Sequence, residues 1–352
     1  MNAFQFCLCV CVSLVLTFST QAHTHRTVLF LGNSYTGVNN LPGIVKDLAT
    51  GAGDTLDVDS YAPGGITLAG HCADPTTLGK IGSKAWNAIV VQAQSQEPSF
   101  PPDQVEQQTL PYAVRLDSII RANDSCTNTV FYETWGRKNG DQQNCAFYPP
   151  VCTYEGMQAR LHDSYKLFAD TCKALMAPVG EAWKHVIQSE PSINLYQPDE
   201  SHPTIEGSYL AACVLYEVIF EKSVIGNTFT GGTSSSVAAF LQQTAHSVVQ
   251  DSATTWNIGK YPRCTSVTSV AEDYEHNEFT VFPNPASRTI DIRALAPFDT
   301  SAVEYTLLDM CGVVMLEGTS NTIDIGALPC GTYLLVAKLN NQHQTTMVVK
   351  TL

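Results

Sequence analysis

Short apolar segments that alternate with helical segments constrain the fold of this chain more than any other feature. The strand-like segments cover residues 28–31, 55–61, 88–91, 128–134 and 177–180. Helical patterns cover residues 39–49, 111–122, 157–176, 207–220 and 236–250. This alternation predicts an α/β domain with a mainly parallel sheet that helices cover on both faces. We expect its ligand to bind where the strands reach their carboxyl ends.

A serine follows the first of these strands at once. The apolar run 28–31 is broken by Gly32 and Asn33, and Ser34 comes next, before a helical segment. A serine in a glycine-containing turn between a strand and a helix is where many α/β hydrolases display a nucleophile. A lone serine in this position more often caps a helix, so the interpretation needs partners elsewhere in the chain.

His202 is the candidate base for this serine. A serine hydroxyl is a poor nucleophile until a base takes its proton, and histidine is suited to that near neutral pH. Asp199 lies three residues before His202, so it can accept a hydrogen bond from one imidazole nitrogen while the other faces Ser34. The alternative is a capping aspartate beside a surface histidine.

Acyl transfer also needs donors for the oxyanion. The backbone N–H of Ser34 is one, and Gly65 or Gly64, after the second strand, supplies another without an obstructing Cβ. Gln94 or Gln92, after the third strand, can supply a side-chain amide. An ordinary turn and a polar strand end would explain the same residues.

These blocks, in this order, resemble the SGNH (GDSL-type) hydrolases over roughly residues 27–250. The resemblance implies a flavodoxin-like three-layer α/β/α sandwich and serine esterase chemistry. It makes Ser34 the nucleophile, His202 the general base and acid, and Asp199 the orienting acid. Gly65 (or Gly64) and Ser34 would then give oxyanion N–H groups.

One block departs from the family pattern. The third block normally carries Gly-x-Asn, but here the same place reads Gln92-Ala93-Gln94, which is typical of a divergent branch. The third oxyanion donor is therefore open between Gln94 and Gln92. For the substrate rim the candidates are Asn33, Tyr35, His71 and Trp135.

The C-terminal part of the chain has a different pattern. Residues 263–278 are rich in Ser, Thr, Glu and Asp and predict a linker between a catalytic domain, 23–262, and a tail, 279–352. Short alternating runs at 289–292, 304–308, 313–316, 332–337 and 346–349 predict a small all-β sandwich of immunoglobulin-like type.

The tail also resembles the C-terminal sorting domain of type IX secretion cargo. Phe-Pro-Asn-Pro at 282–285, Leu-Asp-Met-Cys-Gly at 308–312, Gly-Thr-Tyr at 331–333 and a terminal Lys350 carry the resemblance. It implies that the type IX machinery of a Bacteroidetes-type bacterium exports the chain through the periplasm, for release or surface attachment. The alternative is a carbohydrate-binding sandwich, but the tail has few aromatic residues to stack on a sugar.

Residues 1–22 predict a secretory signal peptide, because residues 6–18 are mostly apolar and Ser19–Ala22 offers a small-residue cleavage site. In an exported protein the nine remaining cysteines predict disulfides. Cys145 with Cys152 is the best pair, and Cys311 with Cys330 is a second. No cysteine spacing resembles a zinc site, and we expect neither a metal nor a cofactor.

The net charge of the chain limits the classes of partner that it can bind. The formal net charge of −14 argues against nucleic acid and anionic membranes. The resemblance to the SGNH hydrolases and the predicted export together imply a secreted serine esterase that removes small acyl groups, above all acetyl, from carbohydrates, and we expect it to be a monomer. The alternatives are a lipase, phospholipase or thioesterase with the same triad, a catalytically inactive glycan-binding protein, and a surface interaction protein.

Overall fold

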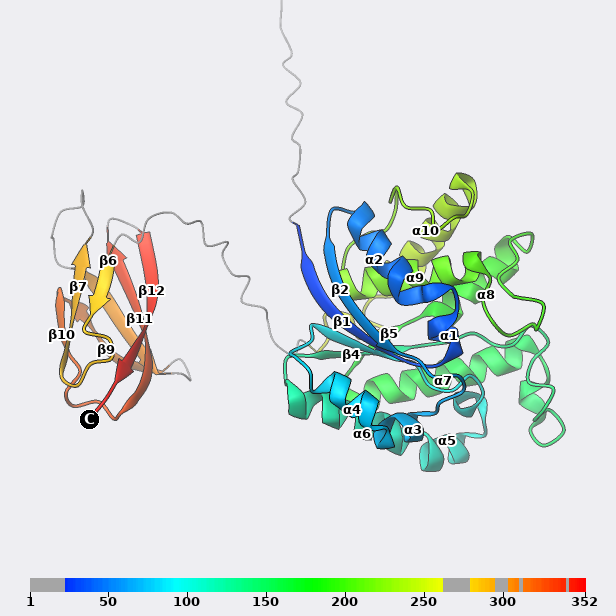
Figure 1. The fold of residues 1–352 in the computed structure, drawn as a ribbon, viewed down its shortest axis with the longest axis horizontal. Coiled ribbons are helices and arrows are strands. Elements are labelled where there is room, and N and C mark those ends of the chain that lie inside the picture. Colours follow the sequence, from blue (N-terminus) through cyan, green and yellow to red (C-terminus); the bar gives the residue numbers. More distant parts are fainter. Residues whose placement is uncertain (1–22, 262–278, 295–302, 310–312, 340–341) are drawn as a thin grey trace, which may run out of the picture. The chain divides into compact units, whose positions relative to one another are not determined.

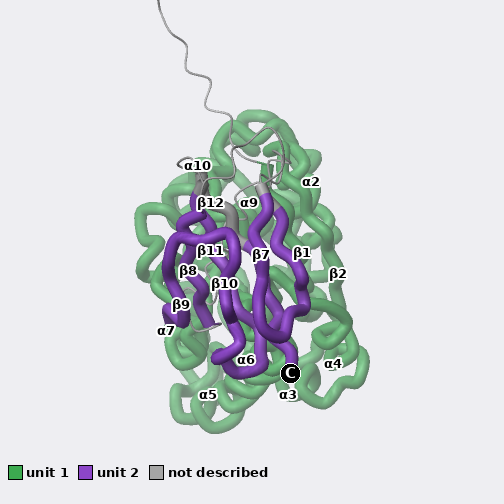
Figure 2. Tube along the Cα trace, turned by 90° about the vertical axis from the view of Figure 1, so that its left-hand side faces the viewer, with its two compact units in different colours: residues 1–265 green, residues 266–352 purple. Residues whose placement is uncertain are grey.

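The computed structural model describes residues 23–261, 279–294, 303–309, 313–339 and 342–352. The chain divides into two compact units, residues 1–265 and 266–352, which Figure 2 shows in different colours. The predicted signal peptide, 1–22, and the predicted linker, 263–278, lie outside the described residues.

The described part of the first unit is built on a five-stranded parallel sheet (Figure 1). Its strands are β1 (His25–Leu31), β2 (Thr55–Tyr61), β3 (Ala88–Val91), β4 (Asn128–Tyr132) and β5 (Leu175–Ala177). They lie in the order β2-β1-β3-β4-β5. The direction of the strand order reverses at β1 and β3, and ligands of such sheets bind at the carboxyl ends of the strands beside that reversal.

Helices cover both faces of this sheet, as Figure 1 shows. One face carries α2 (Leu41–Gly51), α8 (Val179–Ser189), α9 (Ile205–Phe220) and α10 (Ser235–Gln250). The other carries α3 (Leu68–Ala73), α4 (Pro75–Ile81), α5 (Pro102–Gln108), α6 (Leu110–Asn123) and α7 (Tyr154–Cys172). The short helices are α1 (Ser34–Gly37), η1 (Val38–Asn40), η2 (Glu97–Ser99) and η3 (Pro149–Cys152).

Successive side chains of the central strand, β1, contribute to both hydrophobic cores. Val28 and Phe30 pack into the core beneath α2 and α9, whereas Leu29 and Leu31 pack into the core beneath α6 and α7. Successive side chains of a strand point to opposite faces, so a run of four apolar residues fills both sides at once. The predicted three-layer α/β/α sandwich is confirmed.

The fifth strand is displaced from its predicted position. The sequence pattern predicts a helix over 157–176 and a strand over 177–180, but α7 ends at Cys172, β5 covers Leu175–Ala177, and α8 begins at Val179. Lys173 adopts the left-handed conformation, with φ 49°, and ends α7 early. Pro178 lacks an N–H for the sheet and precedes the first residue of α8.

The described residues of the second unit form two antiparallel sheets. One has the order β10-β7-β6, with β6 (Phe279–Phe282), β7 (Thr289–Ala294) and β10 (Thr322–Asp324). The other has the order β12-β11-β8-β9, with β8 (Glu304–Asp309), β9 (Val314–Thr319), β11 (Gly331–Leu339) and β12 (Gln342–Lys350). Ile290 of the first sheet and Leu335 of the second share one core, so the predicted small β-sandwich is confirmed. The sequence analysis missed β6 and β10, which have only four and three residues.

Across the residues that the structure covers, none of the helices has the length and apolar character that a membrane span requires.

Candidate active site

The turn after β1 places Ser34 at the first position of α1. A Cβ on Gly32 would lie 2.2 Å from Thr36 Oγ1 and 2.7 Å from Gln92 Oε1, so only glycine fits there. Asn33 is the N-cap of α1, because its side-chain oxygen accepts a hydrogen bond from the backbone N–H of Tyr35 at 3.1 Å. The local sequence therefore fixes where the serine hydroxyl leaves the sheet.

Gln92 supports this turn from the end of β3. Its Oε1 accepts hydrogen bonds from the N–H of Asn33, at 2.9 Å, and from the hydroxyl of Thr36, at 3.0 Å, and its Nε2 donates to the Ala93 carbonyl. The side chain is fully buried. Gln92 therefore acts on the backbone before Ser34, and this use of its amide disfavours it as the third oxyanion donor.

His71 also supports the turn rather than lining the site. Its Nε2 donates to the carbonyl oxygen of Gly32 at 3.1 Å, and its Nδ1 accepts from the Thr77 hydroxyl at 2.9 Å. The side chain is fully buried, and burial lowers its pKa, so the neutral imidazole is the form that fits.

The structure brings Ser34, His202 and Asp199 together. His202 Nε2 lies 2.8 Å from Ser34 Oγ, and His202 Nδ1 is hydrogen-bonded to Asp199 Oδ2. Because the carboxylate accepts from Nδ1, the other nitrogen is free to accept from the serine hydroxyl. This is the geometry of a nucleophile, a base and a group that orients the base.

Asp199 is also held by the backbone of its own loop. Its Oδ1 accepts from the N–H groups of Ser201, at 3.1 Å, and His202, at 2.9 Å. Partial burial acts to raise the pKa of Asp199, but the hydrogen bonds from the His202 side chain and from these two N–H groups outweigh it and lower the pKa below its ordinary value. Asp199 is therefore a carboxylate at neutral pH.

Three side chains from distant segments hold the loop that carries His202. The Tyr35 hydroxyl lies 2.5 Å from Ser201 Oγ, and Trp135 Nε1 donates to the Ser201 carbonyl at 3.0 Å. Asn39 Nδ2 donates to the carbonyls of Pro203 and Thr204 at 3.1 and 2.9 Å. The sequence analysis missed Asn39 and Ser201, because nothing in a single sequence marks contacts between segments more than 160 residues apart.

The predicted substrate rim is wrong. Asn33, Tyr35, His71 and Trp135 are at most 2% exposed, whereas a rim residue must present a surface to the substrate. Tyr35 stacks on Trp135 with ring centroids 4.8 Å apart, and Trp135 stacks on Trp183 of α8 at 3.8 Å. The edge of Tyr35 also packs against His202, at 5.4 Å. These side chains form a buried support for the triad.

Two backbone N–H groups are available as oxyanion donors. Among the described residues, neither the N–H of Ser34 nor that of Gly65 has a hydrogen-bond acceptor. Gly65 is exposed, as is Gly64, and Gly65 has φ +69°, a conformation that glycine adopts without strain. Gln94 turns away to the next segment, where its Oε1 accepts from the N–H groups of Gln96 and Glu97. Its role as third donor stays a prediction.

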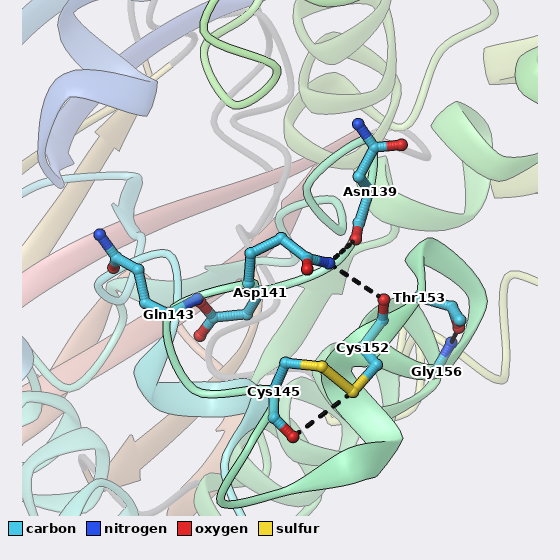
Figure 3. Close-up of a disulfide and its surroundings, with 8 residues drawn as sticks. Asn139, Asp141, Gln143, Cys145, Cys152, Thr153 and Gly156 are labelled. Atoms are coloured by element: carbon cyan, nitrogen blue, oxygen red, sulfur yellow. Dashed lines mark hydrogen bonds between the residues drawn. A yellow bond between two sulfur atoms is a disulfide. The ribbon is translucent and has the colours of Figure 1, made fainter.

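A disulfide closes the loop between β4 and α7. The predicted Cys145–Cys152 bond is present, as Figure 3 shows. Asp141, also in Figure 3, is fully buried and accepts from Gln96 Nε2 at 2.9 Å. This loop reaches the loop of His202, since the Lys138 N–H donates to the Glu200 carbonyl at 3.0 Å. It is therefore built into the surroundings of the triad.

The other predicted disulfide does not form. Cys330 carries a free thiol, and its predicted partner, Cys311, lies outside the described residues. Cys330 is exposed. Cys126, for which the sequence analysis named no partner, is disulfide-bonded.

Residues 280–351 match a family model described as the secretion system C-terminal sorting domain. The tail of this chain is such a sorting domain. The sorting domain indicates export, followed by release or attachment at the cell surface, in a Bacteroidetes-type bacterium. A search among curated proteins returned no match to the chain.

Solved structures share the fold of the first unit. A DUF4886 family protein from Bacteroides uniformis superposes with a TM-score of 0.57 at 19% identity, over 64% of this chain and 96% of that protein. A proposed SGNH hydrolase from Slackia heliotrinireducens gives a TM-score of 0.46 at 26% identity, over 55% and 98% of the two chains. A proposed GDSL-like lipase from Parabacteroides merdae gives 0.43 at 11% identity, over 57% and 98%. At these identities the first comparison establishes the fold alone.

Proposed function

We propose that this chain is an exported serine hydrolase of the SGNH type that cleaves carboxylic esters. The observation that carries the proposal is the contact of 2.8 Å between Ser34 Oγ and His202 Nε2, with Asp199 on the other imidazole nitrogen. The triad lies at the carboxyl end of β1, beside the reversal of strand order, where sheets of this kind bind their ligands.

The reaction follows from this geometry. Ser34 Oγ attacks the ester carbonyl while His202 Nε2 takes its proton, and Asp199 stabilises the imidazolium that forms. We assign the stabilisation of the developing oxyanion to the backbone N–H groups of Ser34 and Gly65. Collapse of the tetrahedral intermediate breaks the bond to the alcohol, which leaves with the proton from His202. Water then attacks the acyl-enzyme with His202 as base, and releases the acid and free Ser34.

A small acyl group on a bulky alcohol is the substrate that this site suits best. The side chains of His202 and Asp199 are 31% and 47% exposed, so the base and the orienting acid lie at the surface of the unit. A surface triad accepts a large alcohol such as a polysaccharide, because the part of the substrate beyond the ester oxygen can stay in solvent. We therefore propose acetyl esters of carbohydrates as the substrate class.

Ester hydrolysis by the purified chain tests this proposal. We expect turnover of p-nitrophenyl acetate and release of acetate from acetylated xylan. Ser34→Ala should lower kcat by roughly 10⁴-fold or more, because the nucleophile is lost. Ser118→Ala, which changes an exposed serine on α6, is the matched control and should keep full activity.

Three results would contradict the proposal in different ways. Equal activity of the parent chain and Ser34→Ala would remove Ser34 from the mechanism. A strong preference for long-chain esters would replace the carbohydrate esterase with a lipase or thioesterase. Binding of acetylated xylan without any acetate release would identify an inactive glycan-binding protein.

A further inference from the structure

Three metal-ligand side chains converge just beyond the carboxyl end of β4. Glu133 directly follows that strand, His162 lies on α7, and Glu181 lies in the first turn of α8. One ligand atom from each lies within 4.8 Å of the other two. The three residues come from three separate elements, so their meeting is a property of the tertiary fold and not of one local motif.

The separations match a shared coordination sphere. His162 Nδ1 lies 3.3 Å from Glu133 Oε1 and 3.7 Å from Glu181 Oε1. Ligands bound tetrahedrally at the usual zinc distances lie about 3.4 Å apart. A cation placed among these three atoms would therefore need only small side-chain movements.

Burial of Glu133 supplies a second, independent observation. Its side chain is fully buried, and although Oε1 accepts from Gln158 Nε2 at 3.1 Å, Oε2 has no hydrogen-bond partner among the described residues. The Tyr154 hydroxyl is also buried without a partner in this part of the molecule. An orphaned carboxylate oxygen is costly to bury, and a cation that both oxygens of Glu133 bind would remove that cost.

The groups around Glu133 are tightly packed. A Cβ on Gly180 would lie 2.3 Å from Gln158 Nε2 and 3.1 Å from the Glu133 carboxyl carbon, so glycine is required at this position. The His162 ring packs edge-on against Trp256 at 5.9 Å.

We propose that Glu133, His162 and Glu181 bind one divalent transition-metal cation of the zinc type. An imidazole nitrogen beside two carboxylates suits Zn²⁺, whereas Mg²⁺ and Ca²⁺ take oxygen ligands. The side chains of His162 and Glu181 are 29% and 23% exposed, which gives the ion a path from solvent and leaves room for water at a fourth position. Lys184, 3.2 Å from the other Glu181 oxygen, neutralises part of the remaining charge.

The bound cation has a structural role. α7 packs on one face of the sheet and α8 on the other, so the ion ties the two helical layers together past the end of β4. Trp183, two residues after Glu181, stacks on Trp135, whose indole N–H holds the His202 loop. The proposal does not depend on the proposed esterase activity.

Titration with ZnSO₄ tests the site. The purified chain, without a histidine tag and after chelator treatment, should bind one equivalent of Zn²⁺ in calorimetry and should bind Mg²⁺ at least 100-fold more weakly. At 100 times the Kd, Zn²⁺ should raise the melting temperature by roughly 5 °C, because only the folded chain holds the three ligands together.

Matched variants locate the ion. His162→Gln and Glu181→Gln, both at partly exposed positions, should weaken Zn²⁺ binding by roughly tenfold or more and abolish the shift in melting temperature. His185→Gln and Glu155→Gln change exposed residues of α8 and α7 and should bind as the parent does. Absence of Zn²⁺ binding by the folded parent, or equal binding by His162→Gln, Glu181→Gln and the parent, would overturn the proposal.

Discussion

Asp199 shows how much of the candidate triad depends on a single side chain. One carboxylate oxygen accepts a hydrogen bond from the His202 imidazole, and the other accepts hydrogen bonds from two backbone N–H groups of the same loop. Its lowered pKa means that the folded chain stabilises the ionised form. This stabilisation is fully present above the pKa of the unfolded chain, about 3.9, and is lost as the pH falls through the lower pKa of the folded chain.

Asp199→Asn tests both parts of this role. At neutral pH the variant should lose roughly 10³- to 10⁴-fold in kcat, because an amide no longer stabilises the imidazolium. The parent should unfold at higher denaturant concentration than the variant at pH 7, and the difference should shrink below about pH 4. Denaturation curves from pH 7 to pH 2.5 measure it. A difference that grows in acid would contradict the assigned direction of the pKa shift.

At the scale of elements, the N-terminal part of the unit provides part of the support for the loop that carries His202. Asn39 adopts the left-handed conformation, with φ 56°, and its Nδ2 reaches Pro203 O, Thr204 O and Ser208 Oγ. The neighbouring Asn40 has nearly the same backbone, with φ 54°, but its side chain makes no hydrogen bond within residues 23–261. Substitutions of Asn39 and Asn40 therefore separate the contribution that the side-chain hydrogen bonds make to stability from the contribution of the left-handed backbone.

Asn39→Ala should destabilise the chain by about 1–3 kcal/mol more than Asn40→Ala, because it removes three hydrogen bonds to the segment that follows His202. Both variants share the cost of a left-handed alanine, so that cost cancels in the difference. Asn39→Ala should also lower kcat several-fold with little change in KM. Thermal unfolding and ester kinetics of the two variants provide the comparison, and equal values for both would remove Asn39 from the support of the loop.

The layered fold was predictable from periodicity, whereas the role of several site residues was not. The alternation of short apolar runs with helical segments predicts the layers, because it shows which segments must be buried. The spacing between Asp199 and His202 places both residues in one turn. Tyr35 and Trp135 were predicted to contact substrate because they lie beside strand ends. Their burial depends on Trp183, a partner that only the tertiary fold brings near.

The fifth strand was misplaced for a similar reason. The apolar residues on both sides of Pro178 give no periodicity that separates a three-residue strand from the first turn of a helix. The left-handed Lys173 that ends α7 carries no strong sequence signal, because glycine and asparagine are the usual residues there.

At the scale of the whole molecule, the chain combines an α/β unit, which we propose to be a hydrolase, with a sorting domain. The sorting domain has its own buried core, which includes Ile290, Leu307 and Leu335. Removal of the tail therefore leaves the core of the first unit intact, while it removes the part of the chain that the export machinery reads.

Deletion of residues 279–352 should keep the protein in the periplasm and leave none at the cell surface or in the medium. Cell fractionation with an antibody against the first unit, in the native host, measures this distribution. A periplasmic marker protein controls for leakage. Normal surface display of the truncated chain would contradict the assignment of the tail.

The distance along the chain between Ser34 and His202 has a consequence for when activity first arises. The two residues are separated by 168 positions, and Asn39 and Tyr35 fix the histidine only after β1 and the segment before α9 have docked. A nascent or partly translocated polypeptide thus has no working nucleophile. The hydrolysis that we propose therefore begins only in copies in which these segments have docked.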